Sequence, residues 1–359
     1  MATLTETAYY TRKGVKITIG LIIGIIVLRF ILGIAGQIWL ALFPPPPPPA
    51  TMAFGLLPKL NFSKTDISST SAKFTYTLET VDGGLPKFPF TLKVYFIPKP
   101  ASSFGGFDKM KAQAVRMGFT SDPQKITGNE ADKWDFTDPL IPLRHLEYNA
   151  TTGFFRLYYD YRFDLNLFAD KSFGSEQKII SDALGFFDKF GLTSRDLLTG
   201  RQEVSYLKLD TTNFISASSL FNADAVRVNL LRSDIIDGKT TYPIVSPFPK
   251  EGLVSILFSG NSDENKKILE AKFYYLNIDY ENFATYPLIS AATALEMLKN
   301  GQGYVASVPT TKSVSIRNIY IGYYDADTVQ SYLQPVVVFS DGKDFKAYVP
   351  AIPASLFQP

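Results

Sequence analysis

The chain has no cysteine and only one histidine among its 359 residues. Without cysteine there is no disulfide, no thiolate metal ligand and no cysteine nucleophile. His145 alone is too little for a His/Cys zinc site, and no G-x-S-x-G turn supplies a serine nucleophile for it. We interpret "PLRHLEYN" around His145 as a strand. The sequence therefore predicts no metal, no cofactor and no catalytic residue, and the protein is not expected to be an enzyme.

The chain also has no large excess of positive over negative side chains, or of negative over positive. The chain holds 36 Lys and Arg against 34 Asp and Glu, a formal net charge of +2. Nucleic-acid binding needs a clustered basic surface, which the sequence does not show, so nucleic acid is excluded as a partner. Neither a P-loop nor G-x-G-x-x-G occurs. The acidic stretches "SGNSDEN" (259–265) and "DYEN" (279–282) lack the spacing of a calcium loop and are interpreted as solvated turns.

One long apolar run stands out, "ITIGLIIGIIVLRFILGIAGQIWLALF", from Ile17 to Phe43. It exceeds the ~20 residues that a helix needs to cross the hydrocarbon of a bilayer. A cleaved signal peptide has a shorter apolar region of about 7 to 15 residues and a small-residue cleavage site. We therefore predict an uncleaved transmembrane helix over residues 17–43, with the lipid bilayer as a partner.

The charges around this run predict its orientation. Arg12, Lys13 and Lys16 precede it, and the first cation after it is Lys59. The positive-inside rule places residues 1–16 in the cytoplasm and the C-terminal part outside the cell membrane. Residues 44–60 begin with six consecutive prolines. Such a run forms an extended polyproline II spacer, so we expect a linker that holds a domain clear of the lipid headgroups.

Arg29 lies near the middle of the predicted span, where an arginine costs about 2.5 to 3.5 kcal/mol. Either the side chain reaches the interface, or it pairs with a carboxylate on a partner helix. Gly20 and Gly24 form a GxxxG pattern that permits close helix approach. A homodimer through the membrane helix is thus one of the hypotheses.

The rest of the chain alternates between strand-like and helix-like segments. Helices are expected over residues 106–119, 175–192 and 290–303, the last two capped by Ser175 and Ser290 and ended by Gly191 and Gly301. "KFTYTLETV" (73–81) and "FTLKVYFIP" (90–98) are expected to form a hairpin through "DGGLPK". "ILEAKFYYLNIDY" (268–280) is interpreted as one strand, and "SVSIRNIYIGYYD" (313–325) as one strand with a bulge.

Few helices and many adjacent strands favour an α+β fold with antiparallel sheets and helices packed on them. The domain prediction is a first α+β lobe over residues 61–205 and a second over residues 206–359.

The C-terminal region is similar to a known kind of module. Residues 286–352 contain "YPLISAATALEMLKNGQGYVA" and "VSIRNIYIGYYDADTVQSYLQPVVVFSDGKDFKAYVPAI". This stretch resembles the terminal module of membrane-anchored YycH/YycI-type regulatory proteins and PepSY-like modules of bacteria. The residues that carry the resemblance are Ala294, Leu298, Gly301, Tyr323, Tyr324, Tyr332, Leu333, Pro335 and Phe339. The resemblance implies a non-catalytic domain that binds or restrains a partner at the envelope, such as a sensor kinase, a peptidase or a wall component.

The leading hypothesis is a single-pass, membrane-anchored extracytoplasmic binding or regulatory protein of the bacterial cell envelope, with an envelope or membrane protein as partner. The alternative is a cell-envelope hydrolase or carbohydrate-binding protein that uses an aromatic groove. Alternating tyrosines belong more often to a core than to a groove. For a ligand surface, the candidate residues are Tyr323, Tyr324 and Tyr332. Paired carboxylates with perturbed pKa values in a pocket would favour the hydrolase.

Overall fold

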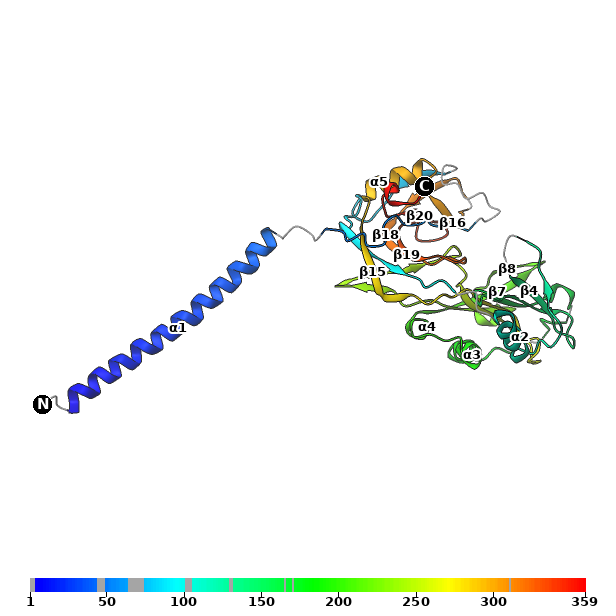
Figure 1. Ribbon diagram of the computed structural model, residues 1–359, viewed down its shortest axis with the longest axis horizontal. Helices are drawn as coiled ribbons and strands as arrows, with labels where there is room; N and C mark the ends of the chain where they lie inside the picture. Colours follow the sequence, from blue (N-terminus) through cyan, green and yellow to red (C-terminus); the bar gives the residue numbers. More distant parts are fainter. Residues whose placement is uncertain are drawn as a thin grey trace. The chain divides into compact units, whose positions relative to one another are not determined.

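A computed structural model describes residues 4–43, 49–63, 74–100, 105–128, 132–164, 166–169, 171–309 and 311–359. The chain divides into an N-terminal unit, Met1–Pro49, and a folded unit, Ala50–Pro359. Figure 1 shows the helix of the first unit and the sheets of the second. Residues 44–48 of the six-proline run lie outside the described residues, and so does most of the spacer predicted there.

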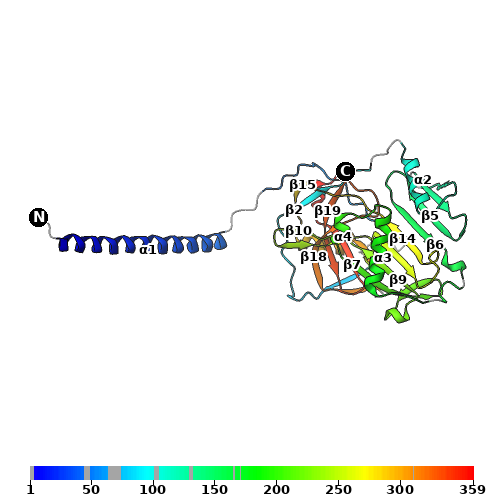
Figure 2. The ribbon, with the colours of Figure 1, turned by 90° about the horizontal axis from the view of Figure 1, so that it is seen from below.

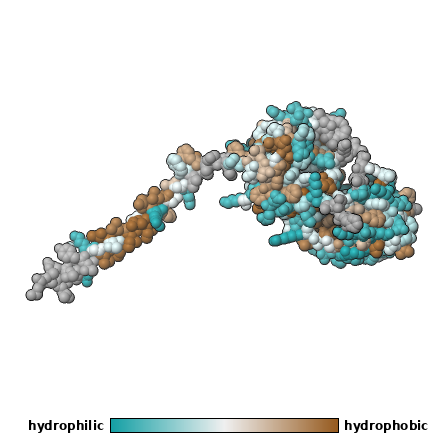
Figure 3. Space-filling view, in the orientation of Figure 1, coloured by the Kyte–Doolittle hydropathy of each residue, from teal (hydrophilic) through white to brown (hydrophobic). Residues whose placement is uncertain are grey.

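The N-terminal unit is a single helix, α1 (Leu4–Leu42). Its segment Arg12–Trp39 is long and apolar enough to cross a membrane, and none of it is buried against protein. At 1.5 Å per residue these 28 residues span about 42 Å, more than the ~30 Å of a bilayer's hydrocarbon core. Apolar side chains cover the middle of α1 in Figure 3. A continuous helix is thus found where the sequence predicts the membrane segment, and it begins earlier, at Leu4.

The described strands of the folded unit form two large sheets. Sheet I has nine strands in the order β3-β4-β5-β6-β14-β13-β9-β7-β8, and neighbouring strands are antiparallel. The strands of sheet I are β3 (Gln124–Lys125), β4 (Lys133–Thr137), β5 (Arg144–Asn149), β6 (Phe155–Tyr159), β7 (Gln202–Asp210), β8 (Asn213–Ser216), β9 (Ala225–Leu230), β13 (Val254–Ser259) and β14 (Ile268–Phe273).

Helices α2 (Gly106–Arg116) and α3 (Glu176–Lys189) cover one face of sheet I, and Figure 2 shows α3 lying across it. The Ser175 side chain caps α3 by accepting a hydrogen bond from the backbone N–H of Lys178. Apolar residues at a helical spacing, Ile179, Ala183 and Phe187, are buried on the sheet. No such helix covers the opposite face of sheet I among the described residues. That face carries an apolar cluster that includes Ala225, Leu257 and Leu269, and beside it a network of charged side chains.

Sheet II has the order β12-β18-β19-β2-β15, with β20 paired to β19 and β16 paired to β20. Its strands are β2 (Thr91–Phe96), β12 (Ile244–Val245), β15 (Asp279–Pro287), β16 (Tyr304–Ser307), β18 (Asn318–Tyr324), β19 (Tyr332–Ser340) and β20 (Lys346–Pro350). Helix α5 (Ala291–Lys299), capped by Ser290, packs Ala294 and Leu298 into the same core as Phe339 and Val349.

Shorter elements complete the folded unit. Helix α4 (Arg195–Thr199) precedes β7. The remaining elements are β1 (Thr75–Leu78), β10 (Ile235–Asp237), β11 (Thr240–Tyr242), β17 (Ser313–Ile316) and the single-turn 3-10 helices η2 (Tyr161–Phe163), η3 (Leu220–Asn222) and η4 (Ala354–Leu356). Near the two ends of the unit, an isolated parallel bridge joins Leu57 to Phe357.

The α+β class and the helices expected at 106–119, 175–192 and 290–303 are confirmed. The hairpin expected between residues 73–81 and 90–98 is wrong, because β1 pairs in parallel with β17 while β2 pairs with β15 and β19. The reason is burial: Leu92 and Val94 make β2 an inner strand with partners on both sides, whereas β1 stays mostly exposed.

Two strand predictions need correction. Residues 268–280 are not one strand, since β14 ends at Phe273 and the chain crosses from sheet I into β15 of sheet II. Residues 313–325 form β17 and β18, separated at Arg317, instead of one bulged strand. The lobe boundary expected between residues 205 and 206 falls inside β7, and sheet I takes strands from both sides of it.

Candidate functional site

A buried arginine lies where segments of the two sheets meet. Arg232 follows β9 of sheet I and is only 4% exposed. Its Nε donates to Asp325 Oδ2 at 2.6 Å, its Nη1 to Asp196 Oδ2 at 2.9 Å, and its Nη2 to the Leu276 carbonyl at 2.6 Å. Asp325 follows β18 of sheet II, and Asp196 lies in α4. We call Arg232, Asp196 and Asp325 the Arg232 cluster.

A glycine lets α4 approach closely enough for this contact. A Cβ on Gly200 would lie 1.8 Å from the Leu231 carbonyl oxygen and 2.8 Å from the carbonyl carbon of Arg232. Only a residue without a side chain fits there. Gly200 therefore allows the end of α4 to pack directly on the segment that carries Arg232, and this packing places Asp196 beside the guanidinium.

Arg232 and Asp196 are held in their charged forms, whereas burial raises the pKa of Asp325 despite the neighbouring charge of Arg232. The Arg232 guanidinium lies 3.8 Å from the centre of the Tyr275 ring, a cation–π contact. Burial opposes the charge of Arg232, but Asp325, Tyr275 and Asp196 outweigh it and raise its pKa further. Burial likewise opposes ionisation of Asp196, yet the charge of Arg232 and hydrogen bonds from Ser194, Tyr275 and Arg232 lower its pKa. Asp196 thus stays a carboxylate at neutral pH.

A cleft of about 600 Å³ opens beside Asp196. We call it the Asp196 cleft. Its lining comes from β2 and β15 of sheet II, from α4 and the residue before it, from residues 233–236 up to the start of β10, and from Asn277 between β14 and β15. The side chains on which the argument depends are Lys93, Tyr95, Arg195, Asp234, Asn277 and Tyr280.

Two tyrosines form an aromatic wall of the Asp196 cleft. The rings of Tyr95 and Tyr280 meet edge to face with centroids 5.7 Å apart. Tyr280 is 37% exposed, and its hydroxyl donates to Asp196 Oδ2 at 3.2 Å. Burial, together with the charge of Asp237, raises the pKa of Tyr95 to about 12. Its hydroxyl is therefore protonated at neutral pH.

The Tyr95 hydroxyl is a free donor. Tyr95 is only 5% exposed, yet its hydroxyl makes no hydrogen bond with any residue that the structure describes. In the part of the chain that the structure describes, three side-chain polar atoms are fully buried and have no hydrogen-bond partner: Asp135 Oδ1, Tyr324 OH and Gln334 Oε1. The Tyr95 hydroxyl oxygen is not one of them, so it is not fully buried. It is therefore open to the Asp196 cleft.

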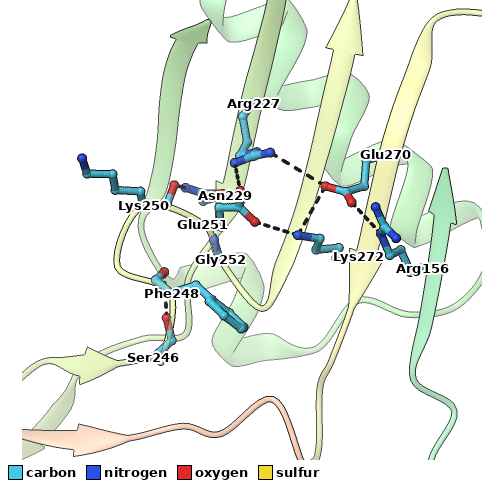
Figure 4. Close-up of polar contacts among 10 residues, drawn as sticks. All are labelled: Arg156, Arg227, Asn229, Ser246, Phe248, Lys250, Glu251, Gly252, Glu270 and Lys272. Carbon is cyan, nitrogen blue, oxygen red and sulfur yellow. Dashed lines mark hydrogen bonds and ion pairs between the residues drawn. The ribbon is translucent and has the colours of Figure 1, made fainter. Parts of the chain in front are cut away.

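A second polar region lies on the open face of sheet I, where Figure 4 shows alternating positive and negative side chains. We call Arg156, Arg227, Glu251, Glu270 and Lys272 the charge ladder. Arg156 Nε donates to Glu270 Oε1 at 2.7 Å, and Lys272 Nζ donates to Glu251 Oε2 at 2.6 Å. Arg227 contacts Glu251 and lies 3.8 Å from Glu270 Oε2.

The loop that carries Glu251 is fixed by its neighbours. The Asn229 side chain accepts a hydrogen bond from the Gly252 backbone N–H at 2.9 Å (Figure 4). A Cβ on Gly252 would lie 2.9 Å from the Val254 carbonyl oxygen, so this close approach also requires glycine. Burial opposes ionisation of Glu251, but Lys272 and Arg227 lower its pKa.

The charge ladder borders a cavity of about 590 Å³, but each of its three cations is already paired with Glu251 or Glu270, which leaves an excess of only one positive charge. A ligand there would have to displace ion pairs that are made within the protein. The Asp196 cleft differs, because it offers hydrogen-bonding groups that no described residue occupies. We therefore take the Asp196 cleft as the candidate binding site and the charge ladder as a set of partly buried ion pairs on one face of sheet I.

His145 lies in β5, as the sequence predicts. Its ring stacks on Tyr158 with centroids 5.1 Å apart, and its Nδ1 lies 3.7 Å from Asp135 Oδ2. Asp135 and Glu147 face each other on neighbouring strands, and burial raises the pKa of Asp135. Glu147 is held by Lys133 at 3.2 Å. The cavity of about 160 Å³ that Glu147 lines is not lined by Asp135.

The tyrosines proposed from the sequence as a ligand surface lie elsewhere. Tyr323 and Tyr324 are completely buried, because strand β18 is covered on both faces. The Tyr323 hydroxyl donates to the Lys93 carbonyl at 2.8 Å, directly behind the Asp196 cleft. Tyr332 is partly buried and packs on Phe54 with ring centroids 4.8 Å apart. Burial thus removes Tyr323 and Tyr324 from any ligand surface.

Sequence reasoning missed Tyr95, Asp196 and Arg232. The only available signal was the aromatic stretch "FYYLNIDY", which contains Tyr280. The proposed membrane contacts Arg29, Gly20 and Gly24 lie in α1 and are exposed. A Cβ at Gly20 or Gly24 would meet nothing within 4 Å, so both leave room for a neighbouring helix. Contact between membrane helices stays a prediction.

No protein-family model matches the chain, and no curated protein matches it.

Proposed function

We propose that the protein is a single-pass, membrane-anchored extracytoplasmic binding protein of the bacterial cell envelope, and that the Asp196 cleft takes its ligand. The observation that carries this proposal is α1, whose apolar segment Arg12–Trp39 is entirely exposed. An exposed apolar surface of that length is stable only when lipid or protein covers it. The similarity of residues 286–352 to YycH/YycI-type and PepSY-like modules fits a regulatory role at the envelope.

The direction of insertion follows from charge. Arg12, Lys13 and Lys16 cluster at the N-terminal end of the apolar segment. Cytoplasmic retention of such residues leaves the folded unit outside the membrane.

The chemistry of the Asp196 cleft suits binding better than catalysis. A general acid needs a carboxyl whose pKa is raised toward neutrality. The pKa of Asp196 is lowered instead, and its oxygens accept hydrogen bonds from Arg232, Tyr275 and Tyr280. The pKa of Glu251 in the charge ladder is likewise lowered. We therefore propose a non-catalytic function over the hydrolase alternative.

The absence of cysteine makes topology easy to test. Val81 is 98% exposed in the folded unit, and Gly14 lies between Lys13 and Lys16, where a Cβ would meet nothing within 4 Å. Val81→Cys and Gly14→Cys each give the full-length protein a single thiol and keep the three cations. In bacterial spheroplasts, a membrane-impermeant maleimide should label Val81→Cys at once and Gly14→Cys only after permeabilisation. Both variants should stay in the membrane pellet at alkaline pH.

Protection of Val81→Cys in intact spheroplasts would reverse the proposed orientation. Recovery of a shortened, soluble protein that lacks α1 would show that the segment is a cleaved leader and would end the anchor proposal.

A further inference from the structure

We propose that the Asp196 cleft binds an uncharged oligosaccharide, with the Tyr280 ring as its stacking surface. This inference rests on the proposed function, which makes the folded unit a binding protein, and it adds the chemical class of the ligand. Three properties of the cleft carry it: its size, its balance of charge and its free hydrogen-bonding groups.

The size suits a short oligosaccharide. Small-molecule sites have volumes of about 300 to 1,000 Å³. The Asp196 cleft, at about 600 Å³, is well inside this range. Ile236, which is 72% exposed, and the Tyr280 ring add apolar surface to the lining. The apolar C–H face of a sugar ring packs on such an aromatic surface.

The charges of the cleft favour a neutral ligand. Lys93 and Arg195 are balanced by Asp196 and Asp234 among the lining residues. Moreover, Asp196 is paired with Arg232, and Lys93 Nζ lies 3.0 Å from Asp237 Oδ1. A strongly anionic or cationic ligand would therefore find no excess of the opposite charge.

The free polar groups favour hydroxyls as partners. The Tyr95 hydroxyl and the side chains of Asp234 and Asn277 line the cleft and make no hydrogen bond or ion pair with any described residue. Together they offer donors and acceptors in one small space. A sugar hydroxyl both donates and accepts, so one sugar unit can satisfy groups of both kinds.

Binding is tested with the full-length protein in nanodiscs, which avoid sugar detergents. The probes are three uncharged trisaccharides, tri-N-acetylchitotriose, cellotriose and maltotriose, followed by saturation-transfer NMR and titration. At least one should bind with a Kd below 10 mM. Tyr280→Ala should weaken that binding about tenfold, whereas Tyr280→Phe should retain most of it. Tyr95→Phe, which removes only the free hydroxyl, should weaken it by about fivefold.

The matched control is Phe221→Ala, which removes an aromatic ring that is 91% exposed and lies outside the cleft. It should leave the affinity unchanged. The proposal is overturned if none of the trisaccharides binds at 10 mM, or if Tyr280→Ala and Tyr95→Phe bind as the unaltered protein does. Binding of a neutral alanine–serine hexapeptide in place of the sugars would also overturn it and assign the cleft to a peptide.

The two proposals fail separately. The nanodisc titration does not depend on which side of the cell membrane the folded unit occupies. Sugar binding by a folded unit that is labelled only from the cytoplasm would keep this inference and end the proposed location. A folded unit that faces outward and binds no sugar would keep the proposed location and end this inference.

Discussion

The Arg232 cluster and the charge ladder both place an arginine between two carboxylates, in very different surroundings. The side chain of Arg232 is 3% exposed, with Asp196 at 11% and Asp325 at 10%. Arg227 is 12% exposed, and its partners Glu251 and Glu270 are at 33% and 12%. The Arg232 cluster joins α4 and sheets I and II, whereas the charge ladder lies on one face of sheet I.

This comparison separates two uses of the same chemistry. In the Arg232 cluster, the guanidinium is almost completely removed from water, so each nitrogen must keep its partner, and the loss of one group leaves a buried charge unpaired. In the charge ladder, solvent and neighbouring side chains can replace a lost partner. The Arg232 cluster should therefore determine how the sheets are held together, and the charge ladder should only adjust the stability of one of them.

The largest effect is expected for Arg232→Met. This change leaves Asp325 and Asp196 buried without their cation, so the free energy of unfolding should fall by about 3–5 kcal/mol. Urea unfolding followed by the fluorescence of Trp134 in β4 reports on sheet I. A second variant, Arg232→Met with Asp196→Asn and Asp325→Asn, should recover part of the loss. If Arg232→Met lowered the free energy of unfolding by less than about 1 kcal/mol, the Arg232 cluster would be no more important for stability than an exposed ion pair.

A smaller loss is expected for Glu270→Gln in the charge ladder. Glu270 meets Arg156 at 2.7 Å, Lys272 at 3.3 Å and Arg227 at 3.8 Å, so the change leaves these cations crowded. We expect a loss of about 1–3 kcal/mol. It should shrink in 1 M salt, where the Debye length is about 3 Å. The control is Lys178→Ala, which breaks an exposed pair with Asp182 in α3 and should cost less than about 1 kcal/mol. A salt-independent loss would show that packing matters there more than charge.

The smallest effect concerns pH and Glu251. Because the pKa of Glu251 is lowered in the folded protein, its ionisation stabilises the fold above the usual pKa of glutamate, about 4.3. That stabilisation is lost as the pH falls through the lowered pKa. Unfolding midpoints from pH 7 to pH 3 should show Glu251→Gln about 1 kcal/mol less stable at pH 7 and equal to the unaltered protein in acid. A constant difference across this range would show that Glu251 does not titrate in this way.

Local signals in the sequence predict the helices well. Ser175 and Ser290 cap α3 and α5 through their own hydroxyls, and Gly191 and Gly301 adopt the positive φ that ends a helix. Such signals lie within a few residues of what they determine. Strand pairing is not determined by such nearby residues. The sequences of β1 and β2 predict a hairpin, yet each strand pairs with a strand far along the chain.

The Asp196 cleft is hidden from the sequence for the same reason. Tyr95 comes from β2, Asp196 from α4 and Tyr280 from β15, and no spacing rule connects them. Their meeting depends on the packing of sheet I against sheet II and on Gly200, whose role is visible only once the Leu231 carbonyl is in place. Of the tyrosines that the sequence did nominate, Tyr323 packs in the same apolar cluster as Phe154 beside sheet I, and Tyr324 packs within the core of sheet II.

The bridge between Leu57 and Phe357 has a mechanical consequence. The Leu57 N–H donates to the Leu356 carbonyl at 2.9 Å, and the Gln358 N–H donates to the Leu57 carbonyl at 2.8 Å. The first and last segments of the folded unit are thus fastened to each other. Tension that enters the folded unit from its N-terminal side would first reach the hydrogen bonds that Thr51 and Met52 make with Thr285 of β15, at 2.9 and 3.0 Å. The two hydrogen bonds at Leu57 come next along the chain, so the load would be divided between an edge strand of sheet II and the C-terminal segment.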